Sequence, residues 1–360
     1  MSSQSIKPNA KVGIVGASGY SGEELVKRLL RHPRTDLVAV TSRQYSGQRV
    51  ADIFPKFSSY PLAQTLKFSD PNPEELAKKA DIIFLALPHG VASEFAVPLL
   101  NAGCRVIDLS ADFRLRDAHV YEEFYAHQHP APELLKQAVY GLPEIRREEI
   151  KKSRLIASPG CYPTSILVPT LPLLRAGLIN PKGIVVNSLS GVSGAGRKAE
   201  IDYLFVECNE SVRAYGVPKH RHLSEIEQEI SIVAGTQVCI QFTPHLIPVN
   251  RGIHTTISAE PITPCFNQTE AESLNQRITN TYESTYSREP FVRLLKGKAL
   301  PDTKNVVGTN FLELAWRIDT RTGRLLLLSA EDNIVKGASG QAVQSMNILC
   351  GYPETEGLMD

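Results

Sequence analysis

The stretch KVGIVGASGYSGEELVKRLL, residues 11–30, decides the fold of the first half of the chain. A short apolar run is followed at once by the glycine turn GASGYSG and then by apolar residues at helical spacing. Strand, glycine turn and helix in this order are typical of a loop that holds a pyrophosphate at a helix N-terminus. The spacing G-x-x-G-x-x-G is weak as a bare pattern, and a purely structural turn is the alternative. We assign to cofactor binding Gly16, Ser18, Gly19, Tyr20, Ser21 and Gly22.

Further apolar runs continue this pattern over residues 36–43, 81–88 and 105–110, with helical segments between them. Continuous apolar strands that alternate with helices predict a parallel sheet covered on both faces. We therefore expect an α/β, Rossmann-like dinucleotide-binding domain over residues 1–160. Polar residues follow the strands at Pro88-His89-Gly90 and before Arg114, at the edge where such sheets bind ligands. We assign Pro88 to the cofactor and interpret His89 as a loop residue.

The end of the second strand indicates which dinucleotide fits. Enzymes that use NAD usually carry Asp or Glu there for the ribose hydroxyls, and this chain has Thr41, Ser42 and Arg43 instead. Hydroxyls and a guanidinium suit a 2′-phosphate, which a carboxylate would repel. A solvated surface arginine is the alternative. We predict NADP(H) as the cofactor, contacted by Ser42 and Arg43.

The composition excludes several classes of function. The chain has 360 residues, 42% hydrophobic and 21% charged, with a net charge of +1, so nothing favours nucleic acid or an anionic membrane surface. No apolar run reaches the roughly 18 residues that span a bilayer. The first residues resemble neither a secretory signal nor a transit peptide, and we expect a cytoplasmic protein. The six cysteines are scattered without metal-ligand or disulfide spacing.

The segment SPGCYPTS, residues 158–165, places a cysteine at a bend ahead of a predicted helix. We expect Gly160 to adopt backbone angles that other residues resist, and Pro163 suits a helical first turn. A thiol at Cys161 would face the amides of the helix N-terminus, which favours the nucleophilic thiolate. A small buried hydrophobic residue is the alternative. Pro169 and Pro172 are expected to kink a longer helix, so only its first turns are predicted.

The second half has a different pattern. Strands are expected over residues 183–190, 238–247, 252–260, 312–319 and 324–332, and the turn TRTG joins the last two as a hairpin. This predicts a mixed, largely antiparallel sheet in an α+β domain over residues 161–332. Residues 333–360 are expected to form a turn and a C-terminal helix.

Three segments of this half can carry chemistry. In SGVSGAGRKA, residues 190–199, a Gly/Ser loop closed by Arg197 and Lys198 could cradle an anion, or be a flexible hairpin. In KHRHLSEI, His220, His222 and Glu225 begin a predicted amphipathic helix. The spacing lets Glu225 orient His222, whereas His220 and His222 should point apart on a helix. If residues 219–222 are extended instead, both rings could face the same side. Two histidines without further ligands do not make a metal site, and we predict none.

The third segment, TPHLIPVNRGIHTT, holds His245, Arg251 and His254 around a proline and a glycine. Arg251 could form a forked pair with a substrate carboxylate. A salt bridge at the end of a strand is the alternative.

Taken together, these segments resemble the N-acetyl-γ-glutamyl-phosphate reductase family of the aspartate-semialdehyde dehydrogenase superfamily. The chain differs from the family's pattern at Pro169 and in a polar N-terminal extension of about ten residues, which we expect to be disordered. It extends in order over residues 16–344 and rests on GASGYSGEEL, ALPHG, DLSADFR, YGLPE, SPGCYPT, SGVSGAGRK, KHRHLSEI, PHLIPVNRGI and DNIVKGASGQAVQ.

The resemblance implies a reaction and roles for residues. NADPH would reduce N-acetyl-γ-glutamyl phosphate to N-acetylglutamate semialdehyde and phosphate in arginine biosynthesis, through a thioester on Cys161. His220 would act as acid/base, with His222 and Glu225 as orienting groups. Further cofactor contacts would come from Ser193, Gly194 and Asn333, and substrate contacts from Arg114, His245 and Arg251.

The resemblance also implies a C-terminal helix that returns to the nucleotide domain and a homodimer or homotetramer. Two alternatives stay open. Aspartate semialdehyde or a carrier-linked aminoadipate semialdehyde would use the same thiol chemistry, and an NADP-binding regulator would have lost it. The presence of Cys161, His220 and Arg251 argues against the regulator.

Overall fold

A computed structural model describes residues 9–197 and 199–359. The predicted disordered extension, residues 1–8, and Lys198 of the predicted anion-binding loop lie outside the described residues. The chain divides into two compact units. The first unit comprises the chain up to Arg116, residues 129–158 and residues from Ala342 onward, and the second comprises residues 117–128 and 159–341.

The first unit is built on a seven-stranded parallel sheet of order β3-β2-β1-β4-β5-β7-β6. The strand order reverses between β1 and β4, and ligands of open α/β sheets bind at such a point. The predicted Rossmann-like architecture is confirmed. The strands are β1 (Ala10–Val15), β2 (Thr35–Thr41), β3 (Phe68–Ser69), β4 (Ile82–Leu85), β5 (Arg105–Asp108), β6 (Val139–Tyr140) and β7 (Leu155–Ala157).

Helices cover this sheet. The first, α1 (Tyr20–Arg31), buries Leu25, Val26 and Leu29 of the apolar positions at helical spacing, and the fourth, Leu30, is half-buried. The last, α14 (Gly340–Cys350), begins at the end of the second unit and continues into the first. The others of this unit are α2 (Val50–Ile53), η1 (Pro55–Phe57), α3 (Pro61–Thr65), α4 (Pro73–Lys79), α5 (Ala92–Asn101), α7 (Pro132–Leu135) and α8 (Pro143–Ile150).

The second unit is built on a seven-stranded mixed sheet of order β12-β13-β14-β11-β8-β10-β9. Neighbouring strands are antiparallel, except that β10 lies parallel to β8 and β12 parallel to β13. The predicted α+β architecture and its hairpin are confirmed. The strands are β8 (Val185–Gly191), β9 (Arg213–Ala214), β10 (Gln241–Ile247), β11 (Ile253–Ala259), β12 (Val292–Leu294), β13 (Leu312–Asp319) and β14 (Arg324–Glu331).

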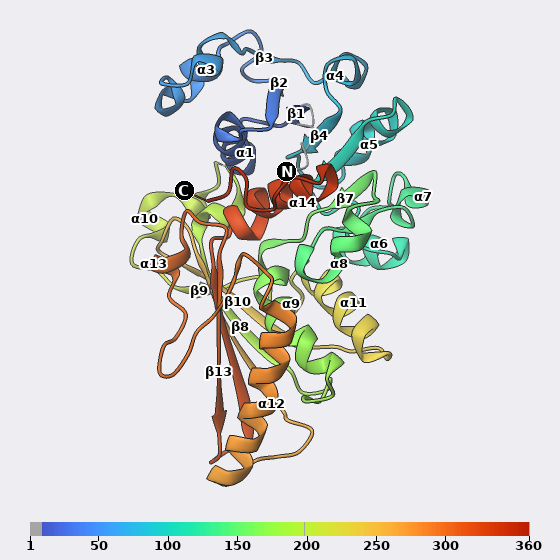
Figure 1. The fold of residues 1–360 in the computed structure, drawn as a ribbon. Coiled ribbons are helices and arrows are strands. Elements are labelled where there is room, and N and C mark those ends of the chain that lie inside the picture. Colours follow the sequence, from blue (N-terminus) through green and yellow to red (C-terminus); the bar gives the residue numbers. More distant parts are fainter. Residues whose placement is uncertain (1–8, 198, 360) are drawn as a thin grey trace, which may run out of the picture. The chain divides into compact units, whose positions relative to one another are not determined.

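One face of this sheet is buried beneath α9 (Cys161–Arg175), and α12 (Gln268–Tyr286) packs beside α9 (Figure 1). Along β11, buried Ile253, Thr255 and Ile257 alternate with half-buried residues of the opposite face. The remaining helices of the unit are α6 (Ala118–Tyr125), η2 (Val192–Ala195), η3 (Ile201–Tyr203), α10 (Phe205–Cys208), α11 (Leu223–Ala234), α13 (Thr303–Val306) and the π-helix η4 (Val335–Ser339).

The helix α9 is continuous through Pro169 and Pro172. The prediction that only its first turns would be helical is wrong. A proline has no N–H, so the carbonyl four residues earlier loses its helical partner. The structure supplies other donors to those carbonyls.

The two carbonyls are those of Ser165 and Val168. Ser329 Oγ donates to the Ser165 carbonyl at 2.7 Å, and the Tyr286 hydroxyl donates to the Val168 carbonyl at 2.6 Å. Both donors belong to elements packed against α9 and are buried. Tertiary hydrogen bonds therefore replace the two that the prolines remove.

Candidate active site

The thiol of Cys161 lies on the first residue of α9, the helix that packs on the second sheet. The preceding Gly160 is the N-cap residue, and its N–H donates to Glu225 Oε2 at 3.1 Å. Cys161 is half-buried and forms no disulfide bond with any of the described residues. Because unpaired amides and the helix dipole make a helix N-terminus electropositive, this position stabilises a thiolate.

Gly160 is required by its neighbours rather than by its conformation. Its angles, φ −66° and ψ 163°, are ordinary extended backbone, so the prediction of an unusual bend is wrong. A β-carbon there would lie 2.6 Å from Nε2 of His222 and 2.8 Å from Oε1 of Glu225. On the other side, a β-carbon on Gly337 would lie 2.8 Å from Cβ of Cys161. The segment around Cys161 is thus held closely by the start of α11 and by η4.

His220 and His222 lie in contact, with ring centroids 4.8 Å apart. The prediction that they point apart is wrong, because α11 begins at Leu223 and both residues precede its first helical position. Nδ1 of His220 accepts the His222 N–H at 3.1 Å. The tautomer with the proton on Nε2 follows for a neutral His220.

An aromatic cage surrounds His220. The rings of Tyr162 and Tyr215 are 5.5 Å from it and the ring of Phe242 is 5.6 Å from it. Burial, with a smaller contribution from the charge of Arg221, lowers the pKa of His220 to about 4. At neutral pH the ring is therefore uncharged and can donate a hydrogen bond from Nε2.

Two tyrosines of this cage were missed by the sequence analysis. The hydroxyls of Tyr162 and Tyr215 are 2.7 Å apart, and burial raises the pKa of both phenols, so both stay protonated. Tyr162 follows the cysteine and Tyr215 precedes the histidine segment. Their adjacency to those motifs is the only signal in the sequence.

A second cluster gathers where β8, β10 and β14 end. The Asn333 side chain accepts from the Gly252 N–H at 2.8 Å and donates to Ser193 Oγ at 2.9 Å. Nη1 of Arg251 lies 3.7 Å from Oδ2 of the buried Asp332. A β-carbon on Gly194 would lie 3.5 Å from the Asn333 amide nitrogen. Ser193, Gly194, Arg251 and Asn333 are therefore brought together.

This cluster adjoins Cys161. The Gly337 N–H donates to the Asp332 carbonyl at 2.9 Å, and Gly337 packs on Cys161. One short turn after β14 thus connects the Asn333 cluster to the thiol.

His245 is not brought to this site. It lies on β10, where Phe242, Pro244 and Leu246 are buried and the alternate positions are not. Phe242 contacts Tyr162 of α9, so alternation places the His245 side chain on the opposite face of the sheet. Its Nδ1 is buried and has no hydrogen-bond partner among the described residues.

Arg114 lies in the first unit and is buried. It donates from Nε to the Ser158 carbonyl at 2.8 Å and from Nη2 to the Leu109 carbonyl at 2.9 Å. These bonds tie the loop after β5 to the residue that ends the first unit before the segment around Cys161.

The glycine turn of the first unit leaves room for a ligand. Gly16 has φ +80°, and a β-carbon there would lie 2.3 Å from the Ala86 carbonyl, whereas one on Gly22 would lie 2.3 Å from the Gly16 carbonyl. At Gly19, the N-cap of α1, the nearest atom would be 3.7 Å away. Fold packing thus explains Gly16 and Gly22 but not Gly19. An open helix N-terminus fits a pyrophosphate.

The predicted ribose-phosphate residues lie beside this turn. Oγ of Ser18 and Oγ of Ser42 are 3.0 Å apart, so the glycine turn and the end of β2 are connected. Ser42 is buried and Arg43 is exposed. Pro88 lies in the loop after β4, next to the Ala86 carbonyl that contacts Gly16.

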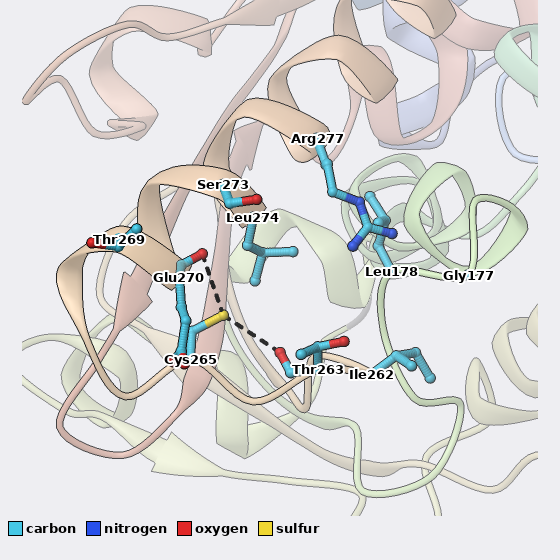
Figure 2. A pocket seen from close by; sticks show the side chains of 10 residues that line it. All are labelled: Gly177, Leu178, Ile262, Thr263, Cys265, Thr269, Glu270, Ser273, Leu274 and Arg277. Atoms are coloured by element: carbon cyan, nitrogen blue, oxygen red, sulfur yellow. Dashed lines mark hydrogen bonds between the residues drawn. The ribbon is translucent and has the colours of Figure 1, made fainter.

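A separate cavity of about 280 Å³ lies in the second unit, between the start of α12 and the segment after β11 (Figure 2). There the Cys265 thiol lies near the carbonyls of Thr263 and Glu270, at 3.4 and 3.7 Å. Burial raises the pKa of this thiol, so Cys265 is a poor nucleophile. None of the predicted site residues lines this cavity.

Two family descriptions match the chain. Residues 11–153 match the semialdehyde dehydrogenase NAD-binding domain, and residues 161–333 match the semialdehyde dehydrogenase dimerisation domain. A protein of Akkermansia muciniphila named N-acetyl-gamma-glutamyl-phosphate reductase is 56% identical over 97% of this chain and 98% of its own. One of Moorella thermoacetica with the same name is 49% identical over 97% of both chains. This chain belongs to the N-acetyl-gamma-glutamyl-phosphate reductase family.

Solved structures of semialdehyde dehydrogenases share the fold. Aspartate semialdehyde dehydrogenase II of Vibrio cholerae, complexed with ASA, has a TM-score of 0.70 at 19% identity and covers 96% of this chain and 99% of its own. The Candida albicans enzyme, solved with NADP, has a TM-score of 0.71 at 16% identity and covers 95% and 98%. The chain is thus a semialdehyde dehydrogenase-family oxidoreductase with a nicotinamide-dinucleotide-binding domain.

Over residues 9–197 and 199–359, no helix is both long and apolar enough to cross a membrane. Within the same ranges, no three His, Cys, Asp or Glu side chains are grouped closely enough to hold a metal ion.

Proposed function

We propose that this chain catalyses the NADPH-dependent reduction of N-acetyl-γ-glutamyl phosphate to N-acetylglutamate 5-semialdehyde and phosphate, a step of arginine biosynthesis. The observation that carries the proposal is the place of Cys161, which is the first residue of α9, follows a glycine that lies against His222 and Glu225, and packs on Gly337. The names of relatives that match nearly the whole chain support the choice of substrate.

In this proposal Cys161 is the nucleophile. Its thiolate attacks the acyl carbon, the bond from that carbon to the phosphate oxygen breaks, and phosphate leaves a thioester on Sγ. The reduced nicotinamide, when bound, supplies a hydride to the thioester carbon. Collapse of the resulting thiohemiacetal oxyanion then releases the aldehyde and restores the thiolate. The amides of the α9 N-terminus are suited to stabilise the negative oxygen.

We assign acid/base assistance to His220 and orientation to His222 and Glu225. His220 is neutral at pH 7 and carries its proton on Nε2, so it can stabilise an oxyanion by donating a hydrogen bond from Nε2. His222 and Glu225 both lie against Gly160, and Glu225 accepts its N–H. These contacts support an orienting role, because they fix the residue that precedes the nucleophile.

For the cofactor we propose NADP(H). The open space at Gly19 supports pyrophosphate binding by Gly16, Ser18, Gly19, Tyr20, Ser21 and Gly22. The absence of an acid at the end of β2, together with Ser42 and Arg43, supports a 2′-phosphate contact. Pro88, Ser193, Gly194 and Asn333 complete the proposed set.

For the substrate, Arg251 is the strongest candidate. It lies in the cluster next to the nucleophile and is partly exposed, with 29% of its side chain accessible. A guanidinium there suits a carboxylate or a phosphate. Arg114 and His245 stay predictions as substrate ligands, and the face on which His245 lies does not favour its role.

We further propose a cytoplasmic homodimer or homotetramer. The dimerisation-domain match over residues 161–333 supports assembly through the second unit. The mass of the assembly in solution tests this, and a monomer at working concentration would contradict it.

The test of the function runs the reaction backward. Phosphate-dependent reduction of NADP⁺ is measured with N-acetylglutamate semialdehyde and, in parallel, with aspartate semialdehyde. The proposal expects turnover with the first at least about 10²-fold above the second in kcat/KM. Equal turnover, or turnover of aspartate semialdehyde alone, would contradict it.

A further inference from the structure

A row of hydroxyls crosses the face of the second sheet that α9 covers. Ser188 on β8, Thr255 on β11 and Ser329 on β14 lie opposite one another across neighbouring strands, and each is 0% exposed. A buried hydroxyl is costly unless it is hydrogen-bonded, and apolar residues would fill the same space. The three buried hydroxyls of this row, called the hydroxyl row below, therefore depend on their hydrogen bonds.

Proton counting gives the direction of these bonds. Ser165, on α9, donates to the Tyr162 carbonyl at 2.9 Å, and its Oγ lies 2.8 Å from Oγ1 of Thr255. Oγ1 of Thr255 lies 2.8 Å from Oγ of Ser188. A hydroxyl has one proton, so Thr255 must donate to Ser165 and Ser188 to Thr255. A directed chain thus runs from β8 to the carbonyl of the residue after Cys161.

The third member of the row holds the same residue of α9 by its backbone. Ser329 Oγ donates to the Ser165 carbonyl, the one that Pro169 leaves without a helical partner. Ser165 is therefore fixed at two atoms, its hydroxyl and its carbonyl. It lies one turn after Cys161 on the same face of the helix.

We propose that the hydroxyl row is a positioning device for the nucleophile, with Ser188, Thr255 and Ser329 as positioning residues that act through the first turn of α9. The inference rests on the proposed function in that Cys161 is the reacting thiol. Cys161 packs on Gly337 so closely that a shift of its helix turn would change its surroundings. A misplacement of about 1 Å at a reacting group can lower a rate by about 10²-fold.

The same helix offers matched controls. Tyr286 donates to the Val168 carbonyl and so replaces the other bond that a proline removes, but farther from Cys161. Thr170 is equally buried, and its hydroxyl donates only within α9, to the Ile166 carbonyl at 2.6 Å. Tyr286→Phe and Thr170→Val therefore each remove a buried hydroxyl from α9 or its packing without breaking the row.

The experiment compares Thr255→Val and Ser329→Ala with Tyr286→Phe and Thr170→Val in the full chain. Three quantities are measured: thermal unfolding, kcat, and the rate at which iodoacetamide labels Cys161 as a function of pH, followed by peptide mass spectrometry. Labelling needs no substrate, so it judges the positioning even if the wild-type chain fails to turn over N-acetylglutamate semialdehyde, which would instead refute the proposed function.

We expect all four variants to unfold at a lower temperature. Only Thr255→Val and Ser329→Ala should lower kcat by about tenfold or more and move the pH profile of Cys161 labelling upward. Thr255→Ser, which keeps the hydroxyl, should restore the wild-type profile. If Thr255→Val does not fold, Ser329→Ala and Ser188→Ala carry the comparison. Wild-type labelling profiles in all folded row variants, or equal shifts in the controls, would overturn the proposal.

Discussion

Two helix N-termini in this chain share one design and differ in what surrounds them. Both α1 and α9 follow a glycine N-cap in extended backbone, Gly19 with φ −74° and ψ 170° and Gly160 with φ −66° and ψ 163°. Neither has a side-chain cap. A β-carbon would find its nearest atom at 3.7 Å on Gly19 and at 2.6 Å on Gly160.

The difference separates two uses of the same local structure. At α1 the space beside the N-cap glycine is left open, which suits a ligand that arrives from solution. At α9 the protein's own His222 and Glu225 occupy that space, and the helix carries a thiol. An electropositive helix end suits anion binding in the first case and, in the second, the thiolate that we propose for Cys161.

The largest expected effect concerns His220, near the start of α9. If His220 assists proton transfer, His220→Asn should lower kcat by about 10²–10⁴-fold. His222→Asn should cost less, because His222 contacts Gly160 and acts through geometry. Steady-state kinetics of both variants, with NADPH binding and circular dichroism as controls, checks this. A larger loss from His222→Asn would transfer the acid/base role to that residue.

The environment of His220 also predicts a pH dependence of stability. Burial lowers its pKa from 6.5 to about 4. Between pH 6.5 and about 4, His220 is therefore protonated in the unfolded chain and neutral in the folded chain. The contribution of His220 to stability therefore falls as the pH falls through this window. The difference in unfolding free energy between His220→Asn and the wild type should therefore shift by about 2–3 kcal/mol in favour of the variant when the pH falls from about 7.5 to about 4.5. Urea unfolding at both pH values measures it, and an unchanged difference would contradict the burial.

Alanine substitutions at the two N-cap glycines test the difference between the two helix starts directly. Gly160→Ala forces its β-carbon against His222 and Glu225 and should cost about 1–3 kcal/mol of unfolding free energy together with activity. Gly19→Ala meets nothing so close and should cost less than about 1 kcal/mol, while NADPH binding weakens about tenfold. Denaturant unfolding and cofactor titration measure both. Equal destabilisation by the two variants would remove the distinction.

The smallest expected effect concerns Arg43, in the unit that contains α1. If Arg43 contacts the 2′-phosphate, Arg43→Ala should lower the preference for NADP(H) over NAD(H) by about tenfold. The ratio of kcat/KM values for the two cofactors measures it. Equal use of both cofactors by the wild-type enzyme would leave Arg43 as a surface residue.

Local patterns predicted most of the fold. The run KVGIV and the hairpin around TRTG predicted β1 and the β13–β14 pair, because period and turn chemistry are properties of neighbouring residues. The length of α9 could not be predicted in this way. Its prolines are tolerated because Ser329 and Tyr286, far along the chain, supply hydrogen bonds to the carbonyls that lose their helical partners.

The candidate site also has features that neighbouring residues predict and features that depend on distant ones. Cys161 could be proposed from a glycine and a helix pattern that stand next to it. The contact of Gly337 with Cys161 and the aromatic cage of His220 depend on residues distant in sequence. Spacing also misplaced the histidine pair, because the helix start lies one residue beyond His222 and spacing alone does not fix it.

The central claim is that Cys161, at the N-terminus of α9, accepts the acyl group. The most direct measurement mixes the enzyme with N-acetyl-γ-glutamyl phosphate without cofactor, quenches in acid and maps the peptides by mass spectrometry. Phosphate release should be a burst of about one equivalent per active site, with the acyl group on the Cys161 peptide as a thioester that hydroxylamine removes. Cys161→Ala should show neither. A burst without an adduct, or an adduct on another residue, would contradict the account.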